Sequence, residues 1–332
     1  MSKPNKWADQ SEPNTPITVI AQDAIERRLN SVWRFAELAG NDADCDVEYV
    51  HQLRVCVRRA SAALTIYAPL LPPSRSRRFR KALKSLRTAA GPARDLDVLS
   101  DRLGSTESRL PKEGLAELQK LVRAQRRKAQ RKLKKGYEKA NEKRIESSGK
   151  KLVAKIRWRE EGDEASFNEY ARIAFEPILN SFFAASRTDL SDVRNLHQMR
   201  IEGKSVRYAM ELLSTAFEQA FREQIYPVFA IVQDKLGAIN DHASAISFYR
   251  ELSKINVRKA CHKAIESMIA WEESKLVEAQ DEFLAWWTPQ RIESMQSQFE
   301  TLLRPPCEDS NRVARVTKPV RDPNGIDSKE VD

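Results

Sequence analysis

The chain has 332 residues, of which 41% are hydrophobic and 31% are charged, so it holds enough apolar side chains for a real core. Lys and Arg number 57 against 47 Asp and Glu, which gives a formal net charge of +10. This surplus predicts attraction to polyanions such as nucleic acid, an acidic membrane surface or polyphosphate. No apolar run approaches the ~18 residues of a membrane-spanning helix, and the first residues lack the apolar core of a signal peptide. We therefore expect a soluble, cytoplasmic protein without a membrane partner.

The sequence predicts an all-α fold. Glycine is scarce, at 10 residues, and long stretches repeat apolar residues with the 3.6-residue period of a helix. Breaks are expected at Pro69, Gly91-Pro92, Pro111 and Gly237. The polar, proline-bearing ends, residues 1–16 and 305–332, are predicted to be disordered tails. The predicted helices span residues 17–39, 47–68, 74–90, 93–103, 112–144, 166–186, 192–215, 220–236, 238–252, 257–287 and 289–303.

The four cysteines show neither a C-x-x-C pair nor a regular framework. They are Cys45, Cys56, Cys261 and Cys307. Free thiols in a reducing compartment are the simplest interpretation.

Two sequence motifs occur twice at one common spacing. The segment VHQLRV at 50–55 recurs as LHQMRI at 196–201, an interval of 146 residues (197 − 51). The segment GPARD at 91–95 recurs as GAIND at 237–241 at the same interval. Two motifs with a shared offset indicate an internal duplication. We therefore divide the ordered chain, 17–304, into a first half at 17–146 and a second half at 164–304.

The helix at 47–68 separates an apolar face from a basic one. At about 100° per residue, its apolar arc lies next to the arc that holds His51, Arg54 and Arg58. The apolar arc contains Leu53, Val57, Ala60, Leu64 and Tyr67. In the helix at 192–215, the apolar residues are Met199, Val206, Met210 and Leu213, and the basic arc contains His197, Arg200, Lys204 and Arg207. Both helices are predicted to turn one face to the core and a cationic face to a ligand, with a merely solvated surface as the alternative.

The next helix of the first half carries a ladder of cations without acidic partners. The ladder comprises Arg77, Arg80, Lys81, Lys84 and Arg87, and residues 74–93 contain no Asp or Glu. Exposed basic residues on helices usually pair with a carboxylate three or four positions away. Here the face repels itself and favours an external anion. The positions 146 residues later hold Glu223, Tyr226, Pro227, Ala230 and Gln233, so the predicted site is asymmetric.

Three other features were weighed. Asp95 and Asp241 follow the motif glycines and are predicted to cap the start of a helix, where a carboxylate stabilises free N–H groups. The helix at 112–144 has cations on nearly every side, so only part of it can face a ligand. The two motif histidines can either anchor the fold or donate to a phosphate oxygen. No histidine or carboxylate recurs beside them at a metal-ligand spacing, so no metal is expected.

The blocks HQLRVCVRRASAAL, KSLRTAAGPARDLDVL, HQMRIEGKSVRYAMEL and VQDKLGAINDHASAI stand in an order that resembles the conserved-histidine α-helical domain (CHAD) family. The resemblance covers roughly residues 17 to 304. It implies two four-helix bundles with long helices, related by a pseudo-two-fold axis, and a basic surface where they meet. It also implies binding of inorganic polyphosphate, location at polyphosphate granules and partner enzymes of polyphosphate metabolism.

The resemblance also assigns candidate ligand residues by position. They are His51, Arg54, Arg58 and Arg59 in the first half and His197, Arg200, Lys204 and Arg207 in the second. Three positions depart from the family pattern, because Ser61 matches Arg207, Ser205 matches Arg59 and Asn240 matches Arg94. With the ladder residues, these side chains form the predicted polyphosphate site.

The expected function is therefore non-covalent polyphosphate binding without catalysis and without a cofactor. The sequence shows no nucleophile with a positioned partner and no P-loop. It also lacks the E-x-E-x-K signature of a triphosphate tunnel enzyme. Three alternatives stay open: a nucleic-acid-binding helical protein, an accessory or regulatory protein of a phosphate-metabolising enzyme, and a scaffold for an acidic partner. Against the first, the sequence shows no recognition-helix motif and no aromatic residues interleaved with the cations.

Overall fold

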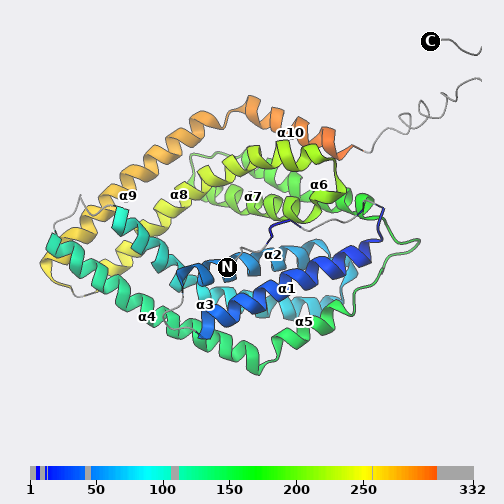
Figure 1. Cartoon of the computed structure of the whole chain (residues 1–332). Helices are drawn as coiled ribbons and strands as arrows, with labels where there is room; N and C mark the ends of the chain where they lie inside the picture. Colours follow the sequence, from blue (N-terminus) through cyan, green and yellow to red (C-terminus); the bar gives the residue numbers. More distant parts are fainter. Residues whose placement is uncertain are drawn as a thin grey trace, which may run out of the picture.

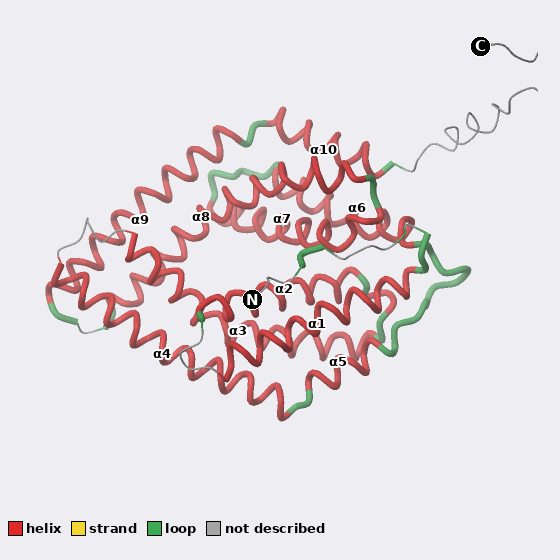
Figure 2. The backbone as a smooth tube through the Cα atoms, viewed as in Figure 1, coloured by secondary structure: helices red, strands yellow, loops and turns green. Residues whose placement is uncertain are grey.

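Helices account for nearly all of the structure, a computed structural model that describes residues 5–7, 12, 14–41, 46–105, 112–255 and 257–304. Within these ranges there are ten α-helices and no strand, which confirms the all-α prediction (Figure 2). None of these helices is both long enough and apolar enough to cross a membrane. The first five are α1 (Ile17–Asn41), α2 (Val47–Ile66), α3 (Pro73–Ser105), α4 (Lys112–Glu142) and α5 (Ile145–Val153). The others are α6 (Phe167–Ser186), α7 (Val193–Leu213), α8 (Tyr226–Ser253), α9 (Lys259–Trp286) and α10 (Pro289–Leu303).

The order of helices in the first part of the chain recurs in the second. Helix α2 begins at Val47 and α7 begins at Val193, which is the interval of 146 residues (193 − 47) that separates the sequence motifs. In Figure 1, α1, α2, α3 and α5 lie on one side and α6, α7, α8 and α10 on the other. Helices α2 and α7 face each other in the middle, and α4 and α9 cross at one edge of the molecule.

Local capping residues fix where these helices begin. The Asp46 carboxylate accepts a hydrogen bond from the backbone N–H of Glu48 (2.9 Å). Asp192, the residue at the equivalent position, accepts one from the N–H of Arg194 (2.8 Å). Such caps satisfy N–H groups that have no partner within the helix. The two motif helices therefore start at equivalent residues because an aspartate caps each of them.

Two predicted helix breaks are wrong. Helix α3 continues through Gly91-Pro92, and α8 continues through Gly237. A proline inside a helix loses one hydrogen bond and crowds the preceding turn. Here the flanking residues Ala90, Gly91 and Ala93 are buried, and the packing of that face sustains the helix.

The cap positions predicted for Asp95 and Asp241 are wrong for the same reason. Both aspartates lie in the middle of continuous helices, α3 and α8, rather than at a helix start. Their carboxylates are therefore available for other contacts, which bear on the functional site.

Helix α5 was not predicted, because its sequence IESSGKKLV is short and largely polar. The chain turns into it at Arg144, whose φ of 49° is left-handed. Helix α5 then packs between α1 and α3. Gly149 permits this close packing, since a Cβ atom there would lie 3.0 Å from Phe79 and 3.2 Å from Leu29.

The core faces predicted for α2 and α7 are confirmed. All of the assigned apolar residues are buried: Leu53, Val57, Ala60, Leu64, Tyr67, Met199, Val206, Met210 and Leu213. In the second half, buried phenylalanines of α6, α8 and α10 meet edge to face, as Phe182 and Phe229 do with ring centroids 5.1 Å apart. Such pairs add to the energy of apolar burial. The cationic faces of α2 and α7 are thereby held in a fixed orientation.

A buried ionic cluster joins α3, α8 and α9. The carboxylate of Glu272, which is fully buried, accepts from Arg102 Nη1 at 2.5 Å and lies 2.5 Å from His242 Nδ1. A charge buried this deeply requires its partner, because removing one member strands the other without solvent. The cluster therefore ties the C-terminal part of α3 to the second half of the chain.

The predicted termini are only partly described. Residues 5–7 lie against α1 and Tyr226, whereas 305–332 and Cys45 and Cys307 lie outside the described residues. Cys56 and Cys261 are free, as predicted, and both are buried. Burial raises the pKa of the Cys56 thiol to about 11, so this thiol stays protonated at neutral pH.

Candidate functional site: a cationic site between helices α2 and α7

Cations of the two repeated motifs come together where α2 and α7 pack against each other. We call this the central cationic site and define it by Arg54 and Arg58 of α2 and by Arg200, Lys204 and Arg207 of α7. Each of these side chains is partly exposed. Arg58 lies within electrostatic range of Arg54, Arg200 and Lys204. The structure therefore joins the two basic faces that the sequence placed 146 residues apart.

Arg54 is held in a socket between α2 and α3. Gly91 allows this approach, since a Cβ atom there would lie 2.8 Å from Nη1 of Arg54. The opposite amino group, Nη2, forms a long ion pair with the Asp95 carboxylate (3.8 Å). Desolvation lowers the pKa of the Arg54 guanidinium, and the neighbouring cations Arg58 and Arg87 lower it further. Gly91 of the GPARD motif thus makes room for the side chain of Arg54 from the VHQLRV motif.

Arg200 and Lys204 occupy the equivalent face of α7. Desolvation, followed by the charges of Arg200, Arg58 and Arg207, lowers the pKa of Lys204 to about 7, and Asp241 opposes this only weakly. Desolvation also lowers the pKa of Arg200. A lysine that is half deprotonated near neutral pH gains its proton when an anion approaches. Without a ligand, the positive charges of the site are therefore not fully compensated by carboxylates.

Three buried guanidinium Nε atoms of the central cationic site form no hydrogen bond with the described residues, and the one of Arg207 lies 3.9 Å from the Glu211 carboxylate. The Nε atoms of Arg54 and Arg200 are buried and form no hydrogen bond with any described residue. Buried donors are normally satisfied, because an unpaired buried polar atom costs free energy. An anion with several oxygen acceptors can satisfy such donors, and arginine grips phosphate oxygens in a bidentate manner.

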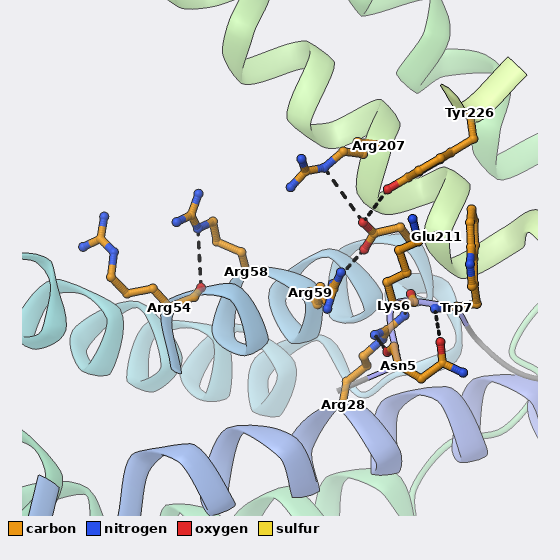
Figure 3. Close-up of polar contacts among 10 residues, drawn as sticks. All are labelled: Asn5, Lys6, Trp7, Arg28, Arg54, Arg58, Arg59, Arg207, Glu211 and Tyr226. Atoms are coloured by element: carbon orange, nitrogen blue, oxygen red, sulfur yellow. Dashed lines mark hydrogen bonds and ion pairs between the residues drawn. The ribbon is translucent and has the colours of Figure 1, made fainter. Parts of the chain in front are cut away.

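A buried carboxylate closes one end of the central cationic site. Glu211 of α7 accepts from Arg59 Nε (2.7 Å) and from the Tyr226 hydroxyl (3.1 Å), and it lies 3.9 Å from Arg207 Nε. Figure 3 shows Glu211 between these side chains, with Arg54 and Arg58 further along α2. Glu211 therefore neutralises Arg59 and part of Arg207, both of which the sequence had assigned to the ligand. Its position four residues after Arg207 was a signal available in the sequence.

The N-terminal residues pack behind this carboxylate. Arg28 of α1 donates to the backbone carbonyls of Asn5 (3.1 Å) and Lys6 (2.6 Å), and Trp7 meets the Tyr226 ring edge to face (Figure 3). Arg28 is buried, and desolvation lowers its pKa. The sequence analysis missed Arg28, although a cation on the apolar stripe of α1 is a recognisable signal.

The predicted ladder of α3 divides between two surfaces. Arg80 donates to the Thr65 hydroxyl of α2 (3.4 Å), and Arg87 lies within electrostatic range of Arg54. Arg77 and Lys84 are exposed, whereas Lys81 lines a separate groove against α5. Only part of the ladder therefore extends the central cationic site.

The two motif histidines have different surroundings. His51 is partly buried in α2, and His197 is exposed on α7. Ligand contact and structural anchoring stay open for both. The described residues include no group of His, Cys, Asp and Glu side chains that could hold a metal ion.

The geometry defines an all-helical protein whose repeated halves present their cations to each other. The CHAD domain profile matches residues 23–250, well over half of the chain, so the protein belongs to the CHAD family. The crystal structure of the CHAD domain from the plant Ricinus communis is similar to it, with a TM-score of 0.71 and 21% identity. That similarity covers 90% of this chain and 96% of the plant chain.

A second solved structure, PptA from Streptomyces chartreusis, has a TM-score of 0.58 and 17% identity. It covers 82% of this chain and 99% of its own. At these identities the two structures support the fold alone. A search of the curated proteins gives no significant match.

Proposed function

We propose that the protein binds inorganic polyphosphate non-covalently at the central cationic site. The observation that carries this proposal is the convergence of five cations from α2 and α7 on a surface whose buried Nε donors form no hydrogen bond with the part of the chain that the structure describes. Membership of the CHAD family, which is associated with polyphosphate, supports the choice of ligand. Polyphosphate repeats its charge at short, even intervals, so many contacts of ~0.2–1 kcal/mol each can add up along one chain.

We propose that the protein binds the polyphosphate chain without cleaving it. The chemistry of the site is that of donors and cations, and the carboxylates of Asp95 and Glu211 are engaged with arginines. Such a protein would hold the chain at a polyphosphate granule or present it to an enzyme of polyphosphate metabolism. Incubation with polyphosphate and Mg²⁺, followed by chain-length analysis, tests this part: shortening of the chain contradicts it.

The site assignment is tested by reversing four charges together. Arg54, Arg58, Arg200 and Lys204 are changed to Glu, and binding of labelled polyphosphate is measured by fluorescence anisotropy. We expect binding to be lost, because the four positions form most of the central cationic site. The matched control reverses four exposed cations elsewhere and should bind like the wild type. These control positions are Arg27, Lys150, Arg250 and Lys254.

Retained affinity in a folded site variant would contradict the assignment. Competition separates polyphosphate from nucleic acid as the ligand. If duplex DNA displaces labelled polyphosphate at equal phosphate concentration, the preference for polyphosphate is wrong. The same titration in rising salt should show a steep loss of affinity, because binding releases counterions.

A further inference from the structure

A second cationic surface lies away from the central site, in a groove between α3 and α5. Its volume is about 680 Å³, and we call it the α3–α5 groove. Five exposed cations line it: Arg75, Arg78 and Lys81 from α3, Lys143 from the turn before α5, and Lys151 from α5. The hydroxyls of Ser85 and Ser148 lie in the same lining.

The cations of the α3–α5 groove have no carboxylate among them. None of the described residues that line the groove is acidic. The acidic residue of α5, Glu146, pairs with Lys150 at 3.0 Å, and neither residue lines the groove. Like charges held together on two helices repel each other, and an external anion removes that repulsion.

The second half of the chain shows that the fold does not require these charges. Helix α10 follows α9 as α5 follows α4, and it packs against α6 and the start of α8. The positions 146 residues after the five groove cations hold Phe221, Gln224, Pro227, Pro289 and Ser297. A pair of helices in the equivalent place is therefore built without a single cation at these positions. The charge of the α3–α5 groove calls for an explanation outside folding.

The groove is continuous with the central cationic site across the exposed face of α3. At about 100° per residue, the seven cations from Arg75 to Arg87 cover an arc of about 240°, with no gap wider than about 60°. Arg87 and Arg80 stand at the α2 end of this arc, and Arg78 and Arg75 stand at the α5 end. Arg77, Lys81 and Lys84 fill the interval between them.

The base of the groove selects among anionic ligands. Its large apolar side chains, Phe79 and Leu152, are already buried, with exposed fractions of 5% and 2%. A partner helix or a lipid needs an open apolar pocket in which to anchor a side chain or an acyl chain. The α3–α5 groove instead offers charge and hydroxyl groups, which suits a ligand that consists of phosphate groups alone.

We propose that the α3–α5 groove is a second segment of the binding track, which holds the part of a long phosphate chain that extends beyond the central cationic site. This inference rests on the proposed polyphosphate function. A chain that occupies both segments gains affinity because its second contact is intramolecular. A chain too short to cross α3 gains nothing from the groove.

The test compares ligands of two lengths on a groove variant and a matched control. The groove variant is Arg78→Glu with Lys151→Glu, and the control is Arg27→Glu with Lys150→Glu, which has the same net charge. Tripolyphosphate and long-chain polyphosphate are titrated against each protein over a series of salt concentrations. Circular dichroism and thermal melting establish that both variants are folded.

We expect the groove variant to bind tripolyphosphate like the control and long-chain polyphosphate about tenfold more weakly, since several modest ionic contacts are lost together. The slope of log affinity against log salt should also become shallower for the long chain alone. Equal affinity of both variants for the long chain would overturn the inference while leaving the central site intact. Failure of the wild type to bind the long chain would instead overturn the proposed function.

Discussion

The lowered pKa of Lys204 leads us to predict that polyphosphate binding is coupled to proton uptake. Its ammonium group is crowded by Arg200 and Arg207 on its own helix and by Arg58 on α2, and the Asp241 carboxylate of α8 gives little compensation. Together with desolvation, these cations lower the pKa of Lys204 from 10.5 to about 7. A bound polyanion supplies the missing negative charge and favours the protonated form. Affinity should therefore fall as the pH rises above 7.

The size of the effect follows from the pKa shift. If the bound phosphate chain restores the ordinary pKa of 10.5, raising the pH from about 7 to about 9 should weaken binding about 50-fold, or ~2.3 kcal/mol. The complex should take up about half a proton at pH 7 and about one proton near pH 8.5. Partial restoration of the pKa would give a smaller change with the same sign.

Isothermal titration calorimetry in buffers of different ionisation enthalpy measures this proton uptake directly. The control is Lys204→Arg, which keeps the positive charge throughout this pH range. It also accounts for protons that the ligand or the two histidines exchange, because those groups remain in the variant. Equal pH dependence in the wild type and in Lys204→Arg, or a flat profile in the wild type, would refute the reasoning.

Two further substitutions test other contacts. Gly91→Ala should weaken polyphosphate binding several-fold by displacing the Arg54 guanidinium. Gly237→Ala should leave binding unchanged, because an added Cβ there would meet no atom of another element within 4 Å. Thermal melting should show neither variant destabilised, since alanine favours helix more than glycine by about 1 kcal/mol. Glu272→Ala should lower the free energy of unfolding by about 3 kcal/mol, because it removes the buried carboxylate that pairs with the partly exposed Arg102 and with His242. Urea denaturation measures this loss, and a value below about 1 kcal/mol would show that solvent compensates Arg102 for the lost carboxylate.

Only the folded chain shows the surroundings of several candidate site residues. The family resemblance assigned Arg59 and Arg207 to the ligand, and the structure places the Glu211 carboxylate 2.7 Å from Arg59 Nε and 3.9 Å from Arg207 Nε. Helical periodicity shows which residues share a face, but it does not show which face of another helix lies opposite. Asp95 was placed at a helix start for a related reason, since the local sequence suggests a break that burial overrides.

Local sequence by itself determined the helical class, the starts of the two motif helices and the repetition of their motifs. Apolar periodicity, capping residues such as Asp46 and Asp192, and the shared interval of 146 residues (193 − 47) are all carried by neighbours along the chain. Only the tertiary structure decided how the charges are used. Packing of α2 on α7 concentrates the central cations, desolvates Lys204 and pairs Arg59 with Glu211. Desolvation and ion pairing depend on residues far apart in sequence, so no reading of a single helix could assign them.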